Sequence, residues 1–92
     1  MKSKVNEDVQ KKFLSELGKQ IKKIRKDKKM TQEDVAIRLN GDLQKISRIE
    51  RGIYDFKISS LLIIAYGLDV EVNELLKIKN IEKFKNLIWG NH

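Results

Sequence analysis

Residues 31–52, TQEDVAIRLNGDLQKISRIERG, constrain the fold of this chain more than any other part of its sequence. They contain two short helical patterns, over residues 31–39 and 43–51, with Asn40-Gly41-Asp42 between them. Asn and Gly tolerate the left-handed backbone that ends a helix, and Asp is a common cap at the start of the next one. We therefore predict two helices joined by a tight turn, with the remainder of the chain holding them in place.

The composition of the chain favours an all-α fold. Its 92 residues are 40% hydrophobic, which suits a single core, and with no Pro and only 5 Gly there is little to interrupt long helices. Lys and Arg number 20 against 13 Asp and Glu, for a formal net charge of +7. This excess predicts a polyanionic partner, although charge alone does not choose between nucleic acid and an anionic membrane surface.

Several functional classes are disfavoured. There is no Cys and the only His is His92, so we expect no metal site, no cofactor and no enzyme activity. The longest apolar run, residues 61–66, is far shorter than the roughly 20 residues of a membrane-spanning helix. Residues 1–10 turn polar where a secretion signal would be apolar, and we expect a cytoplasmic, nucleoid-associated protein.

The spacing of apolar residues predicts the first three helices. A stripe at intervals of three to four residues indicates a long first helix over residues 9–28, with residues 1–8 frayed or adding a turn: Val9, Phe13, Leu14, Leu17, Ile21 and Ile24. Thr31 is expected to cap the second helix and Asp42 the third. The residues expected to face the core from these two helices are Val35, Ala36, Leu39, Ile46 and Ile49.

Three further helical segments are expected downstream. Ser59 or Ser60 should cap a mostly apolar helix that is central to the core and ends at Gly67, and a short helix should contain residues 73–76. A last helical segment carries its own apolar stripe: Ile78, Ile81, Phe84, Leu87, Ile88 and Trp89. That stripe is compatible with completing the core, forming a homodimer interface or binding a protein partner.

Three blocks resemble the phage-repressor type of helix-turn-helix domain, the Cro/repressor or XRE-like family, over roughly residues 17–76. They are LGKQIKKIRKDKKMTQEDVA, KISRIERG and SSLLIIAYGLDVEVNELL, each in family order and spacing. The resemblance implies a compact, lambda-repressor-like bundle of about five helices, with residues 43–51 as the recognition helix. We accordingly divide the chain into an N-terminal extension or helix start (1–12), the DNA-binding domain (13–76) and a C-terminal helical extension (77–92).

The recognition helix suits the major groove of DNA, because one of its faces is polar and the other carries Ile. Gln44 occupies the family position most often used for base contact, and its amide can pair with adenine N6 and N7. Arg48, one turn later, suits guanine or a phosphate, and Lys45 suits either as well. Leu43 is expected to touch a thymine methyl group or to cover the gap left at Gly41, where the family usually has an apolar residue. Ser47 is a further candidate for base contact.

Other matching positions imply contacts to the DNA backbone or a structural role. Gln32 matches the family residue that meets a phosphate from the start of the first motif helix, and Tyr54 and Lys57 lie in a loop that follows the backbone. That loop departs from the family near Phe56, where a proline is usual. Arg25 and Glu50 match a buried or half-buried ion pair that joins the first helix to the end of the recognition helix.

The resemblance and the charge together predict a sequence-specific regulator of double-stranded DNA, which we expect to be a repressor. One short helix reads only a few base pairs, so a homodimer on an inverted repeat is expected. The alternative is an antitoxin or protein-interaction module in which residues 78–89 bind a partner protein.

Overall fold

The computed structural model describes residues 4–39 and 41–78. This part of the chain folds into five helices and contains no strand: α1 (Lys4–Asp27), α2 (Gln32–Arg38), α3 (Leu43–Arg51), α4 (Ile58–Leu68) and α5 (Val72–Leu75). The predicted all-α bundle of about five helices is therefore confirmed. Asn40 and the C-terminal stripe beyond Ile78 lie outside the described residues, and Ile78 itself is buried.

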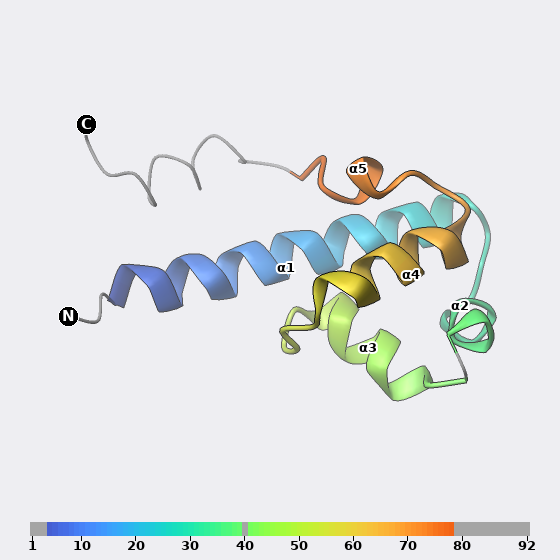
Figure 1. Cartoon of the computed structure of the whole chain (residues 1–92), viewed down its shortest axis with the longest axis horizontal. Coiled ribbons are helices and arrows are strands. Elements are labelled where there is room, and N and C mark those ends of the chain that lie inside the picture. The colour runs from blue at the N-terminus through green and yellow to red at the C-terminus, as the bar shows by residue number, and fades with distance from the viewer. Residues whose placement is uncertain (1–3, 40, 79–92) are drawn as a thin grey trace.

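The long helix α1 is the frame on which the other helices pack. In Figure 1 it runs along the long axis of the molecule, with α3 on one side and α5 on the other. It starts at Lys4 rather than near Val9, so of the two alternatives expected for residues 1–8, a frayed end or an extra turn, residues 4–8 follow the second. Glu7 lies in the first turn, where a negative charge is favourable, and Gln10 is tied by a hydrogen bond to Asp55.

The two helices of the central motif have the predicted N-caps. The bounds of α3 are those predicted, and α2 lies within residues 31–39 with Thr31 and Leu39 as its caps. Thr31 Oγ1 accepts a hydrogen bond from the Asp34 backbone N–H (3.0 Å), and the Asp34 carboxylate accepts one from the Thr31 N–H (2.8 Å). The Asp42 side chain likewise accepts from the Lys45 N–H at the start of α3 (3.0 Å). Gly41 and Gly52, on either side of α3, both have a positive φ, which suits glycine.

The reciprocal cap at α2 has an electrostatic consequence. The hydrogen bond from the Thr31 backbone, followed by that from its side chain, holds the pKa of Asp34 below its ordinary value. Because the folded-state pKa is the lower one, the contribution to stability is present above the ordinary carboxylate pKa and is lost as the pH falls through the lowered value.

The core gathers side chains from all five helices. It contains the inward residues predicted for α2 and α3, except that Leu39 is only partly buried. The buried apolar residues of α1 to α5, with Ile78 after α5, are Val9, Leu17, Ile21, Val35, Ala36, Ile46, Ile49, Leu61, Ile64, Ala65, Leu68, Leu75 and Ile78. Its tightest helix contact lies between α1 and α3. A Cβ atom on Gly18 would be 2.4 Å from the Ile49 carbonyl oxygen, so only glycine lets the two backbones meet here.

The ends of α4 differ from the sequence-based prediction. Neither Ser59 nor Ser60 caps the helix, because it begins at Ile58 and the residue before it, Lys57, makes no side-chain cap. Gly67 does not end it either, since the helix continues to Leu68.

Gly67 instead lies at the contact between α4 and α2. A Cβ there would meet Arg38, Val35 and Leu39 at 3.7 Å or more, and the Gly67 carbonyl accepts a hydrogen bond from Arg38 Nη1 (2.9 Å). The chain leaves α4 through Asp69, which adopts the left-handed conformation.

Only one face of α4 belongs to the core, although its apolar sequence predicted a central helix. The buried face carries Leu61, Ile64, Ala65 and Leu68. A second apolar face is exposed to solvent and consists of Ile58, Leu62, Ile63 and Tyr66. We call these four residues the α4 outer face.

The close approach of α1 to α3 makes a direct prediction for stability. Gly18→Ala inserts a methyl group against backbone atoms that cannot move aside, and we expect it to lower the free energy of unfolding by about 2 kcal/mol or more. Gly67→Ala is the matched control, because its Cβ meets only ordinary van der Waals contacts, and it should be neutral or stabilising by up to about 1 kcal/mol. Urea denaturation measures both. A Gly18→Ala protein as stable as the wild type would contradict the packing described.

Candidate nucleic-acid interface

The outward side of α3 is the polar face that the sequence predicted. Ile46 and Ile49 are each 1% exposed, whereas Gln44 and Arg48 are exposed on the opposite side of the helix. Arg51, which was not among the predicted site residues, lies three residues after Arg48 and falls on the same ridge. The three-residue spacing of the basic residues in α3 was the available signal for it. We call Gln44, Arg48 and Arg51 the α3 ridge.

Leu43 does not cover the space beside Gly41. An ideal Cβ built on Gly41 would have no neighbour within 4 Å, so that space is open, and Leu43 is 44% exposed at the start of α3. Leu43 is thus an exposed apolar side chain at the first turn of α3, and its contact with a thymine methyl group stays a prediction.

Lys45 and Ser47 are less exposed to solvent than the residues of the α3 ridge. Lys45 is half-buried and its Nζ donates to Ser60 Oγ (3.3 Å), which turns it toward α4. Ser47 is also half-buried. Its backbone carbonyl accepts a hydrogen bond from Arg51 Nε (3.3 Å), which restrains the Arg51 side chain and does not involve the Ser47 hydroxyl. Leu43 is therefore exposed at the first turn of α3 beside the α3 ridge, and Lys45 and Ser47 are half-buried at the flanks of the ridge.

Arg25 and Glu50 form a buried ion pair between α1 and α3. Arg25 Nε donates to Glu50 Oε2 (2.6 Å) and Nη2 donates to Oε1 (3.1 Å), with side-chain exposures of 9% and 2%. A third donor of the same guanidinium, Nη1, reaches the Met30 carbonyl (2.7 Å) just before α2. This fork-to-fork geometry satisfies both charged groups away from water.

Gln32 is linked to this pair. It is half-buried at the first position of α2, and its Nε2 donates to Glu50 Oε1 (3.0 Å). The sequence contained no signal for this contact, because the two residues are 18 positions apart.

The loop between α3 and α4 carries the other two predicted phosphate contacts. Tyr54 is 38% exposed and its ring stacks on Phe56, with 6.3 Å between the ring centroids. Phe56 is partly buried against the core, and the Asp55 carboxylate accepts a hydrogen bond from Gln10 Nε2. These two contacts hold the loop in place without the proline that is usual in the family. Lys57 is exposed at the end of this loop, before α4.

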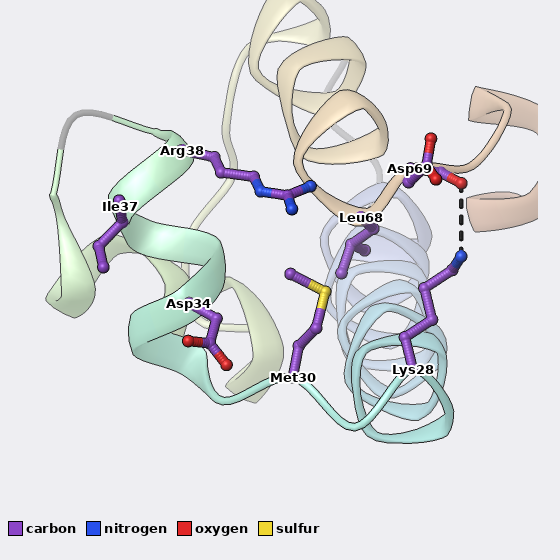
Figure 2. Close-up of a pocket in the computed structure, with 7 residues that line it drawn as sticks. All are labelled: Lys28, Met30, Asp34, Ile37, Arg38, Leu68 and Asp69. Carbon is purple, nitrogen blue, oxygen red and sulfur yellow. Dashed lines mark hydrogen bonds between the residues drawn. The ribbon is translucent and has the colours of Figure 1, made fainter.

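An open hollow of about 650 Å³ lies away from α3, between the end of α1, α2 and the end of α4. Figure 2 shows Met30 and Leu68 pointing toward each other inside it, with Lys28 and Arg38 at its rim. Both cations donate to backbone carbonyls, Lys28 to Asp69 (3.4 Å) and Arg38 to Gly67 (2.9 Å). The hollow shares no residue with the predicted DNA contacts.

The described residues hold neither a metal-binding cluster nor a membrane-spanning helix. Within residues 4–39 and 41–78, no group of three or more His, Cys, Asp or Glu side chains is placed to hold a metal ion. No helix in the described part of the chain is long and apolar enough to cross a membrane.

The sequence of residues 21–75 matches the helix-turn-helix family HTH_3. The chain belongs to the helix-turn-helix family. A search of curated proteins found no match. As a member, the chain is a DNA-binding transcription regulator, in agreement with the resemblance seen in the sequence.

Solved helix-turn-helix structures are similar over most of the chain. The restriction-modification controller protein C.Esp1396I, as a tetramer in complex with its natural 35 base-pair operator, is 39% identical over 84% of this chain and 95% of that one, with a TM-score of 0.65. The wild-type C.Esp1396I structure is 38% identical over 86% and 96%, with a TM-score of 0.64. The controller C.AhdI from Aeromonas hydrophila is 29% identical over 67% and 94%, with a TM-score of 0.65. These similarities do not favour the alternative of an antitoxin or protein-interaction module.

The buried ion pair yields a prediction for the helix-turn-helix domain. Glu50→Ala leaves the Arg25 guanidinium buried without its partner, and we expect a loss of about 3–5 kcal/mol in stability together with weaker DNA binding. Lys23→Ala is the control, because the Lys23–Asp27 pair is exposed and such pairs contribute at most about 1 kcal/mol. Thermal unfolding followed by circular dichroism compares the two. An unchanged melting temperature in Glu50→Ala would contradict a structural role for the pair.

Proposed function

We propose that this protein is an operator-binding transcriptional repressor that acts as a homodimer in the cytoplasm, on nucleoid DNA, with α3 in the major groove. The observation that carries the proposal is the α3 ridge, which projects polar side chains from a helix fixed by two fully buried Ile residues. The similarity to restriction-modification controllers supports a role in controlling such a system, and one of them is bound to its own operator.

The exposed residues of α3 divide by chemistry into base and phosphate contacts. Gln44 is proposed to pair with adenine and Leu43 to touch a thymine methyl group. Arg48 is proposed to contact guanine or a phosphate. Arg51, at the last turn of the helix, is nearer the loop and is proposed to bind phosphate. Ser47 is proposed as a flanking base contact.

The remaining contacts are proposed to position the protein on the DNA backbone. Gln32 approaches from the start of α2, and Tyr54 and Lys57 approach from the loop before α4. Lys45, whose ammonium group donates to Ser60 Oγ, is proposed to contact a phosphate or a guanine on the α4 side of α3. Phosphate contacts set the register of α3 without reading sequence.

The division between base and phosphate contacts is tested by comparing two glutamines. Gln44→Ala should weaken binding to the preferred duplex and leave binding to random duplex nearly unchanged, because it removes a base contact worth about 1–3 kcal/mol of discrimination. Gln32→Ala should weaken both duplexes by a similar factor. Fluorescence anisotropy titrations measure this over a range of salt concentrations, and wild-type affinity should fall steeply with salt. Equal effects of both variants on specificity would mean that α3 is not the reading helix. A salt-insensitive affinity would contradict the proposed phosphate contacts.

The α4 outer face supports the homodimer. Ile58, Leu62 and Tyr66 are spaced four residues apart, form one stripe, and are 75%, 53% and 77% exposed. A cluster of large exposed apolar side chains marks an interaction surface. We propose that the stripe packs against the same stripe of a second copy around a two-fold axis, which places two α3 helices on half-sites about 34 Å apart.

Leu62→Glu tests this interface. The side chain is not part of the core, so the monomer should fold with an unchanged helix content, while the charge prevents apolar packing between copies. We expect a monomer in sedimentation analysis and at least a tenfold loss of operator affinity. Ile37→Glu is the matched control, because Ile37 is 68% exposed on α2, away from the stripe, and this variant should remain dimeric. A dimer formed by Leu62→Glu with unchanged affinity would rule out the α4 outer face.

A further inference from the structure

The amide of Gln32 is held in one orientation by the buried carboxylate of Glu50. An ionised carboxylate accepts hydrogen bonds but donates none, so it binds the Nε2 end of the amide and not the Oε1 end. Glu50 is itself immobilised, because it accepts hydrogen bonds from Nε and Nη2 of Arg25 and its side chain is only 2% exposed. A glutamine without such a partner would be free to turn either end of its amide outward.

The single bond to Glu50 leaves Gln32 with hydrogen-bonding capacity. A carboxamide nitrogen carries two hydrogens, of which Glu50 accepts one, and Gln32 is only half-buried. The guanidinium that fixes Glu50 also binds the Met30 carbonyl, two residues before Gln32. One buried network therefore restrains both the amide and the chain segment that carries it.

We propose that Glu50 is a positioning residue for DNA binding, which orients the Gln32 amide so that its second N–H donates to a phosphate oxygen. The inference rests on the proposed function and gives the buried pair a role beyond stability. The proposal requires the two hydrogens of Gln32 Nε2 to have different partners, one bonded to the Glu50 carboxylate in the protein and the other to a phosphate oxygen of the DNA. Neither Gln44 nor Arg48 is bonded to this network in the structure.

The two hydrogens can be observed separately by NMR in the ¹⁵N-labelled wild-type protein. The Gln32 side-chain signals are assigned by their absence in Gln32→Ala. When a duplex selected for binding is added, one Nε2 proton should keep its shift and the other should move downfield and exchange more slowly with water. If both protons keep their free-protein shifts while the duplex is bound, or if both move together, the proposal is overturned. This measurement needs no variant of Glu50.

A double-mutant cycle on DNA affinity gives the second test. Gln32→Ala should weaken duplex binding by about tenfold, a loss typical of one hydrogen bond to a charged group. Its salt dependence should be unchanged, because a neutral amide releases no counterion. Glu50→Gln, which lets either end of the Gln32 amide turn outward, should also weaken binding, but should have no further effect in the Gln32→Ala background. Additive effects would overturn the proposal.

Matched controls separate positioning from loss of fold and from failure of the proposed function. If Glu50→Gln weakened DNA binding only by partial unfolding, it would do so equally in the wild-type and Gln32→Ala backgrounds. Gln44→Ala is the control background, in which the effect of Glu50→Gln on affinity should be fully additive. Should Glu50→Gln not fold, Glu50→Asp retains the charge beside Arg25 with a shorter reach, and the same cycle applies. Wild-type protein that binds no duplex would refute the proposed function itself, whereas binding with an additive cycle would refute only this inference.

Discussion

The buried ion pair between Arg25 and Glu50 is the interaction on which the arrangement of the motif depends. Burying two charges is costly, and the cost is met here because each carboxylate oxygen has a donor and the guanidinium also binds the Met30 carbonyl. The pair therefore joins α1, the entry to α2 and the end of α3 at one point. This pair and the close backbone contact at Gly18 together fix the position of α3 against α1.

The DNA-reading side of α3 follows from what its other side buries. Ile46 and Ile49 occupy the core, and the helical repeat then forces Gln44 and Arg48 to the outside. Caps at both ends, Asp42 before the helix and Gly52 after it, limit α3 to nine residues. Such a short helix can place its polar residues in a groove only if a larger body holds it, and α1 and α4 provide that body.

Local signals predicted the motif well, whereas contacts distant in sequence could not be predicted. The caps at Thr31 and Asp42 depend on a side chain and a backbone group three residues away, so sequence alone identifies them. Gly67 resembles a helix end, but packing against α2 makes it an interior residue. The bonds from Gln32 to Glu50 and from Lys45 to Ser60 cross between helices. Half of the apolar run in α4 is exposed, and the apolar character of the sequence did not reveal which half faces the core.

The central claim is that two copies of α3, held by this bundle, read a specific operator. Selection of bound duplexes from a random pool tests it most directly, because it assumes nothing about the operator. We expect an enriched inverted repeat whose half-site centres are about one helical turn of DNA, or a multiple of it, apart. Binding without enrichment of any sequence, or enrichment of an unrepeated site, would contradict it.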